Sequence, residues 1–174
     1  KLIEEAANTG RGMDVVNLSF EYRRSADFEA LKGDPVLTTI SELGRNTLFV
    51  VAAGNDGEEL SAICDKRPAC FDLPNVISVA AFDQWKEGMP LLEQKDGASN
   101  FGRRVHVAAP GREVLSLAAN NYFGVMSGTS QAAPQVAAIA AMMRAAKPNL
   151  TPADVKERLV TCSIPIKAGA ASLT

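Results

Sequence analysis

The chain has little of several features that would place it in a special class of protein. Lys and Arg total 18 against 20 for Asp and Glu among 174 residues, so the formal net charge is −2 at pH 7. This near balance excludes the basic footprint of a nucleic-acid-binding domain and the acidic tail of a charged linker. The longest aliphatic run, 136–143, is far shorter than the roughly 18 residues of a membrane span. We therefore expect neither a nucleic-acid partner nor a membrane partner.

Cysteine is scarce, and glycine and proline occur only at ordinary levels. Three cysteines are too few for a disulfide-built miniature protein, and 13 glycines with 9 prolines exclude collagen-like sequence. Cys64 and Cys70 lie in one loop, where they form either a small disulfide or two free thiols, and Cys162 is expected to pack within a helix. The apolar content of 47% is ordinary for a globular protein, and its even spread predicts a single domain.

The first residues predict that the chain begins inside a helix. Leu2, Ile3, Ala6 and Ala7 follow helical spacing, and neither an initiator methionine nor a capping residue precedes them. We interpret the chain as a fragment of a longer protein, with N-terminal processing as the alternative. The missing targeting segment then gives no information on the cellular compartment.

Short apolar runs alternate with helical patterns along the rest of the chain. The expected strands are 14–20, 47–53, 75–81 and 105–109, with a hairpin of 114–117 and 122–126, and the expected helices are 35–43, 130–146 and one starting at 151. Helix 130–146 is apolar on all sides, which predicts burial at the domain centre, and 83–100 is predicted to be a loop with short edge strands. The alternation predicts an α/β fold, with a mainly parallel sheet and helices on both faces.

A hydroxyl group at the start of helix 130–146 is the first candidate for chemistry. Ser130 follows Gly128 and Thr129, and the N-terminus of a helix favours developing negative charge through its unpaired N–H groups. This position suits a serine nucleophile whose attack creates an oxyanion. The alternative is that Thr129 or Ser130 only caps the helix.

A second candidate follows the buried strand 47–53. Asn55 lies just beyond the carboxyl end of that strand, where ligands bind in open α/β sheets. Its amide could donate a hydrogen bond to an oxyanion. The plainer interpretation of Asn55-Asp56-Gly57 is a turn.

The single histidine, His106, is predicted to be structural. It lies within a predicted strand, and nothing in its position predicts the contact of about 3 Å that a base needs with a nucleophile. A nucleophile-elbow hydrolase is excluded as well, because that family places its histidine after the serine and none follows Ser130.

Six blocks of sequence together resemble the subtilisin-like serine peptidases, the subtilase family, and occur in that family's order. Residues 128–134, Gly-Thr-Ser-Gln-Ala-Ala-Pro, are similar to the nucleophile motif, and 50–55 resemble the strand that ends in the oxyanion-hole asparagine. The other four blocks are 14–19, 74–81, 99–102 and 107–111. The resemblance implies a subtilisin-like fold truncated at its N-terminus, with 1–174 forming part of a catalytic domain.

The resemblance also implies roles for individual residues. Ser130 would be the nucleophile, and the Asn55 amide would bind the oxyanion together with the Ser130 backbone N–H. The residues implied to contact substrate are Ser19, Phe20 and Glu21 on one wall of the cleft, and Ala52, Ala53 and Gly54 along the primary specificity pocket. Glu21 stands where the family commonly has glycine, and it either favours a basic substrate side chain or obstructs binding.

The catalytic aspartate and histidine of the family precede the helix at which this chain begins, and neither motif is present here. We therefore expect the fragment alone to be inactive and its parent to be a serine endopeptidase acting on peptides or proteins. The rival interpretation is a non-catalytic, subtilase-like module that binds peptides or other partners.

Three further expectations concern cofactors, location and assembly. The residues predict no cofactor, because no carboxylate cluster has the form of a metal site, and the resemblance implies calcium only in the parent. The resemblance also favours a secreted or extracytoplasmic location. An apolar sheet edge left by truncation would allow copies of the chain to pair.

Overall fold

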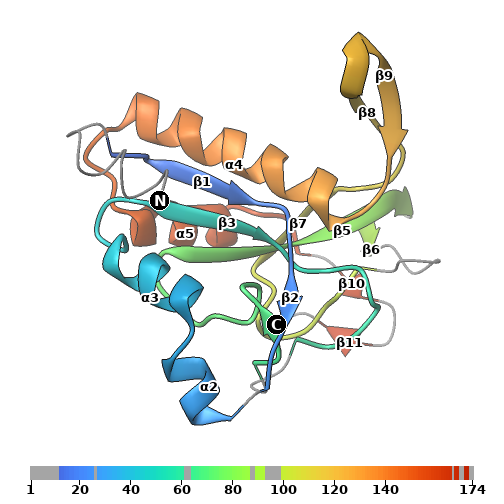
Figure 1. Ribbon diagram of the computed structural model, residues 1–174. Coiled ribbons are helices and arrows are strands. Elements are labelled where there is room, and N and C mark those ends of the chain that lie inside the picture. Colours follow the sequence, from blue (N-terminus) through green and yellow to red (C-terminus); the bar gives the residue numbers. More distant parts are fainter. Residues whose placement is uncertain are drawn as a thin grey trace.

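A five-stranded sheet lies at the centre of the molecule (Figure 1). The structure, a computed structural model, describes residues 12–25, 27–60, 64–86, 89–92, 99–165, 167–168 and 171–172, so the helix expected at the start of the chain lies outside it. The strands are β1 (Val15–Leu18), β3 (Leu48–Ala52), β5 (Val76–Lys86), β6 (Met89–Leu92) and β7 (Val107–Pro110). All neighbouring pairs are parallel except β5 with β6. The predicted α/β class with a mainly parallel sheet is confirmed.

The sheet separates two apolar cores, because side chains alternate between the two faces of a strand. In β3, Leu48 and Val50 belong to one core, whereas Phe49 and Val51 belong to the other. All four are at most 1% exposed, so β3 is buried on both faces, as its unbroken apolar run predicts.

Helices cover both faces of the sheet. On the first face lie α4 (Thr129–Ala146) and α5 (Pro152–Thr161), and on the second lies α3 (Pro35–Glu42) beside the loop that contains Phe71. Figure 1 shows α4 running along the sheet with its first turn near the carboxyl ends of the strands. That end of the sheet is where the candidate residues of the sequence come together.

Side chains next to the first turn cap α3 and α5. The Asp34 carboxylate accepts hydrogen bonds from the backbone N–H groups of Val36 and Leu37, and Pro35 begins α3. In α5, Thr151 and Asp154 form a capping box, because each side chain bonds the other's backbone N–H. Both helices therefore begin at the residues that local sequence predicts.

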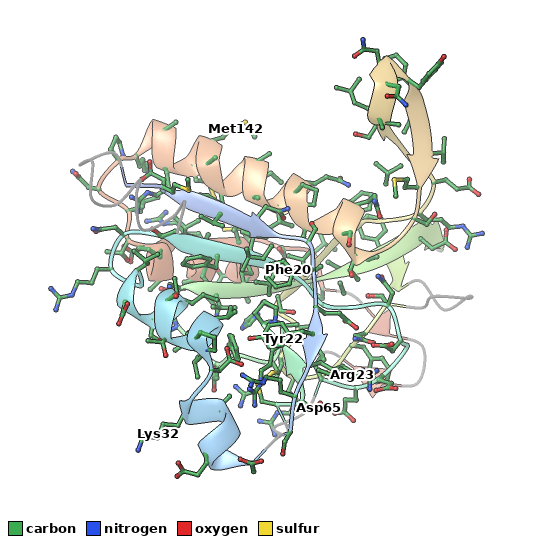
Figure 2. All side chains as sticks on the ribbon, in the orientation of Figure 1. Phe20, Tyr22, Arg23, Lys32, Asp65 and Met142 are labelled. Atoms are coloured by element: carbon green, nitrogen blue, oxygen red, sulfur yellow. A yellow bond between two sulfur atoms is a disulfide. The ribbon has the colours of Figure 1, made fainter. Side chains whose placement is uncertain are left out.

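The prediction that α4 is buried all round is wrong. Ala132, Ala133 and Ala140 are fully buried against the sheet, but Ile139 is 46% and Met142 is 62% exposed. In Figure 2, Met142 points away from the sheet. Apolar residues on the outer face of a helix become buried only where another layer covers them, and the described residues provide no such layer.

Two smaller predictions also need correction. The strand expected to end at residue 81 continues as β5 to Lys86, because its polar end pairs with β6. Cys162 does not pack within a helix: it caps the carboxyl end of α5 and is an exposed free thiol. Cys64 and Cys70 form a disulfide, which resolves the alternative that the sequence leaves open.

The remaining elements are short. The predicted hairpin is present as β8 (Val114–Leu117) and β9 (Phe123–Met126), joined by the 3₁₀ turn Ala119–Asn121. The others are α2 (Phe28–Lys32), the antiparallel pair β2 (Tyr22–Arg23) and β4 (Lys66–Arg67), and the pair β10 (Lys167–Ala168) and β11 (Ala171–Ser172). Among the described residues, no helix combines the length and the apolar character needed to cross a bilayer.

Candidate active site

The first turn of α4 is held at the carboxyl end of the sheet by glycines. Gly128 caps the helix with φ at +137°, a conformation that side-chain-bearing residues rarely adopt. Its N–H donates to the carbonyl of Gly111, just beyond β7, at 2.7 Å. Ser130 is the second residue of the helix, so its backbone N–H has no acceptor four residues back within the helix. The serine therefore stands among unpaired donors at the positive end of the helix dipole.

Asn55 is fixed directly beside this turn by Thr129. The Asn55 Oδ1 accepts a hydrogen bond from the Thr129 backbone N–H at 2.9 Å and another from the Thr129 hydroxyl at 3.1 Å. The same hydroxyl oxygen accepts from the N–H of Gly54 at 3.1 Å. With Oδ1 occupied in this way, the amide nitrogen Nδ2 of Asn55 is the atom left to donate to a ligand. The predicted proximity of Asn55 to the start of α4 is thus present in the structure.

A buried asparagine shapes the loop that carries Asn55. Asn100 is fully buried, and its Nδ2 donates to the carbonyl of Ala53 at 2.9 Å. Its Oδ1 accepts from the N–H groups of Asp56 and Glu58 at 3.1 and 3.0 Å. These contacts hold the loop from both sides of Asn55, which leaves the Asn55 side chain on a rigid turn.

The segment that follows β1 lies against the nucleophile candidate. The Ser19 hydroxyl donates to the carbonyl of Ser130 at 3.0 Å, and the Ser130 hydroxyl lies 3.4 Å from the carbonyl of Ser19. Asn17 in turn donates to the Ser19 hydroxyl at 2.9 Å. Sequence positions 111 residues apart therefore meet at the point where the chemistry is expected.

Phe20 and Glu21 continue this segment toward β2. Phe20 is 47% exposed at the end of β1, where Figure 2 labels it. The Glu21 carboxylate lies over Gly54, because a Cβ placed on Gly54 would stand 2.0 Å from Glu21 Oε2. Gly54 has φ at +98°, so both its conformation and this contact require a residue without a side chain.

Ala52 and Ala53 are placed differently from the other predicted substrate contacts. Both residues are at most 3% exposed, backbone included, and their side chains belong to the two apolar cores on either face of the sheet. Neither residue therefore offers a surface to a substrate in this structure. Their role along a specificity pocket stays a prediction.

Carboxyl groups near Gly54 experience different environments. Burial and the neighbouring Asp56 carboxylate raise the pKa of Glu21, although Lys66 and Arg23 counteract this in part. Burial acts in the same direction on Asp56, but the cations of Lys66 and Arg23 outweigh it and hold the pKa of Asp56 below its usual value. Glu21 is therefore the carboxyl group of the site whose charge is least compensated.

A buried network anchors the same segment from the opposite side. The Tyr22 hydroxyl donates to Asp34 at 2.7 Å, and the Arg67 guanidinium, which is fully buried, donates to the same carboxylate at 2.7 Å. Arg67 also donates to the carbonyl of Ser25 at 2.8 Å. Because Tyr22 is held inward, the neighbouring Glu21 is held on the other face of the chain, toward Gly54.

His106 has the structural role that the sequence predicts for it. It precedes β7, whereas Gly111 at the far end of that strand contacts the first turn of α4, so the imidazole and Ser130 lie at opposite ends. Its Nδ1 accepts from the backbone N–H of Ser78 at 2.9 Å, which requires the neutral ring. Burial, aided by the nearby Lys156, lowers the pKa of His106 to about 4. It is therefore not placed to serve as the base for Ser130.

Two contributors to the site were not predicted from the sequence. The sequence identifies Thr129 only as a candidate helix cap and Asn100 only as part of a motif, yet these two residues position Asn55. Their partners lie 74 and 47 residues away along the chain, so no local pattern reveals the contacts. Within the described residues, no group of three or more His, Cys, Asp or Glu side chains is arranged to hold a metal ion.

Comparison with known proteins identifies the family. The model of the subtilase family, peptidase S8, matches residues 1–171. Subtilisin-like protease 11 of Trichophyton verrucosum is 33% identical over 166 residues, which are 92% of this chain and 36% of that protein. Subtilisin-like protease 2 of Plasmodium falciparum is 34% identical over 101 residues, which are 58% of this chain and 7% of that protein.

Solved structures agree with this match. A cold adapted subtilisin-like serine proteinase superposes with a TM-score of 0.68 and 26% identity, covering 90% of this chain and 50% of its own. A psychrophilic protease gives a TM-score of 0.74 and 25% identity, covering 98% of this chain and 56% of its own. The chain thus spans about a third of the fungal relative and about half of each solved structure. On its sequence motifs, its fold and these similarities, the chain belongs to the subtilase family.

Proposed function

We propose that this chain supplies the nucleophile and the oxyanion hole of a subtilisin-type serine endopeptidase. The observation that carries the proposal is the pair of hydrogen bonds from Thr129 to Asn55 Oδ1. They orient the Asn55 amide beside the helix turn that bears Ser130. A donor and a nucleophile held on rigid elements are what acyl transfer requires, because charge that develops on the carbonyl oxygen must find donors already in place.

The reaction proceeds in two halves. Ser130 Oγ attacks the peptide carbonyl carbon while a base takes its proton, and the resulting oxyanion accepts hydrogen bonds from Asn55 Nδ2 and the Ser130 N–H. The C–N bond then breaks as the proton passes to the leaving amine, which leaves an acyl group on Ser130. Water hydrolyses this ester by the reverse sequence of proton transfers.

The base and its orienting aspartate come from outside this chain in this proposal. The only histidine of the sequence is His106, which is engaged with Ser78 at the other end of β7. In this structure, Ser130 Oγ lies 3.4 Å from the carbonyl of Ser19. The fragment alone should therefore be inactive, because loss of the base costs about 10⁶ in turnover in subtilisin, a relative of this chain.

Substrates would be peptides or proteins that lie along the segment from Ser19 to Glu21. The border that Ala52, Ala53 and Gly54 are predicted to form on the opposite side stays a prediction, because all three residues are buried in this structure. The disulfide between Cys64 and Cys70 supports a secreted or extracytoplasmic location, since such bonds persist in oxidising compartments. Calcium binding in the whole protein stays a prediction, with no residues of this chain assigned to it.

Fluorophosphonate labelling tests the proposal. The whole protein should react with the probe and cleave a casein substrate, the variant Ser130→Ala should do neither, and the matched variant Ser41→Ala on α3 should do both. The isolated chain should remain unlabelled. A whole protein that neither takes up the probe nor cleaves casein would instead support the rival, a subtilase-like module that only binds peptides.

A further inference from the structure

The charges around Gly54 do not cancel. Among the described residues, two cations lie within 4 Å of Asp56 and Glu58. Arg23 lies 3.2 Å from the Asp56 carboxylate and 3.6 Å from that of Glu58. Lys66 pairs with both carboxylates as well. Glu21 forms no ion pair within 4 Å with a described residue, although the charges of Lys66 and Arg23 act on it from a greater distance. Three carboxylates thus face two cations, and the one without an ion pair is Glu21, which shares a side-chain hydrogen bond with Asp56 and lies against Gly54.

The position of Glu21 is enforced from several directions. Its Oε2 lies against Gly54, the residue immediately before Asn55, in a space that no side chain on Gly54 could share. The inward anchor of Tyr22 on Asp34 keeps the backbone of this segment in place. Glu21 itself is exposed, whereas Gly54 is buried, so a ligand would reach the carboxylate from the solvent side.

A substrate side chain that reaches the exposed side of Glu21 would have to provide a partner for its carboxylate. An apolar side chain would cover the carboxylate and remove its water without offering a partner, which is unfavourable. A guanidinium or ammonium group would instead form a charge-assisted hydrogen bond, while Lys66 and Arg23 remain paired with Asp56 and Glu58.

Resting on the proposed endopeptidase function, we propose that Glu21 is a specificity-determining residue that favours arginine or lysine at the substrate position preceding the scissile bond. The assignment to that position follows from the adjacency of Gly54 and Asn55: a side chain against Gly54 belongs to the residue whose carbonyl oxygen is bound by Asn55. The substrate class is therefore peptides with a basic residue on the acyl side of the cleaved bond.

Kinetics on the whole protein test this assignment. A set of fluorogenic peptides would differ only at the acyl-side residue, which is Arg, Lys, Leu, Gln or Glu. For the native protein, kcat/KM should be at least tenfold higher with Arg or Lys than with Leu. Glu21→Gln keeps the shape and removes the charge, so it should lower kcat/KM for the basic peptides about tenfold and leave the Leu peptide within about twofold.

Two further variants make the test specific. Glu42→Gln removes one carboxylate from the exposed side of α3 and should leave the profile unchanged. Glu21→Arg reverses the charge and should move the preference from Arg toward Glu. Higher activity on the Glu peptide could not result from a loss of stability, because a misfolded variant would lose activity on every peptide.

The outcomes separate the two proposals. A Glu21→Gln variant that cleaves every peptide faster would show that Glu21 obstructs the site, and an unchanged profile would show that it does not contact the substrate; either result overturns this inference and leaves the endopeptidase function intact. A native protein that cleaves none of the peptides and takes up no fluorophosphonate would overturn the endopeptidase function and this inference with it.

Discussion

At the scale of single residues, the site depends on side chains that take no part in the proposed reaction. Thr129 is fully buried and connects Gly54 to Asn55 through one hydroxyl group. Its hydroxyl and backbone N–H together occupy Asn55 Oδ1 and so leave Nδ2 for the oxyanion. The chemistry assigned to Asn55 is thus a consequence of how Thr129 orients it.

Replacement of Asn55 by aspartate tests the donor alone. The variant Asn55→Asp keeps an oxygen for the two hydrogen bonds from Thr129 but removes the N–H group that would bind the oxyanion. We expect kcat to fall by about 10²–10³, the range known for loss of this donor in subtilisin, a relative of this chain. KM should change little, and Ser130 should still take up fluorophosphonate slowly; a kcat within twofold of native would contradict the role of Asn55.

His106 makes stability dependent on pH. Its pKa is about 4 in the folded protein against 6.5 in the unfolded chain, because burial and the nearby Lys156 disfavour the charged ring more than Asp72 favours it. In that interval the unfolded chain binds more protons, so stability falls as pH falls from about 6.5 toward 4. The full loss is on the order of 3 kcal/mol.

Urea denaturation at several pH values measures this effect. The native protein should lose stability between pH 6.5 and pH 4, and the variant His106→Gln should lose less over the same interval, because glutamine cannot be protonated there. Equal losses in the two proteins would mean that other groups, such as Asp72 with its Arg104 partner, account for acid unfolding.

At the scale of elements, local sequence determines where the helices begin but not what surrounds them. The caps of α3 and α5 were predictable because Asp34 and Thr151 act on N–H groups two or three residues away. The exposure of Met142 was not, because it depends on whether another segment covers the outer face of α4. The continuation of β5 to Lys86 was not either, because it depends on antiparallel pairing with β6, the next strand along the chain. The spacing of apolar residues in a helix or strand does not indicate whether another layer covers it or an antiparallel strand pairs with it.

The anchor of β2 gives a sharp test of element packing. Asp34→Asn preserves the cap of α3, since asparagine also accepts from backbone N–H groups, but it leaves the buried charge of Arg67 without its carboxylate. Such a loss costs about 3–5 kcal/mol. Thermal or urea unfolding should show this decrease, while the partly exposed Asp65→Asn should change stability by less than about 0.5 kcal/mol.

If Asp34→Asn lowers the free energy of unfolding by less than about 1 kcal/mol, the Asp34–Arg67 pair is not what holds β2 in place. The position of Glu21 would then rest on Gly54 alone.

Because Tyr22 also donates to Asp34, the variant Tyr22→Phe offers a milder perturbation of the same network. We expect it to cost about 1 kcal/mol, the usual contribution of one hydrogen bond.

At the scale of the whole molecule, the proximity of Ser130 and Asn55 was predictable because each lies in a motif of the family, and the structure brings their segments together. What could not be predicted is the set of contacts that joins them, since Asn100 and Thr129 act over long separations in sequence.

β1 is an edge strand of the described sheet, with β3 on one side only. That edge is consistent with the expectation that copies of the chain pair there.

Sedimentation velocity over a concentration series tests this pairing. An edge strand offers unpaired N–H and C=O groups to a second chain, so the isolated chain should form dimers as its concentration rises from about 1 to 100 μM. The whole protein should not associate in this way if further chain covers β1. A monomer at every concentration of the isolated chain would contradict self-association through this edge.

The central claim, that Ser130 and Asn55 act on the same carbonyl group, is tested most directly by a crystal structure of the whole protein with a peptidyl boronic acid. The account predicts a tetrahedral boron bonded to Ser130 Oγ, with one boronate oxygen about 2.7–3.1 Å from Asn55 Nδ2 and from the Ser130 N–H. A boron bonded to another residue, or a boronate oxygen that faces away from Asn55, would contradict it.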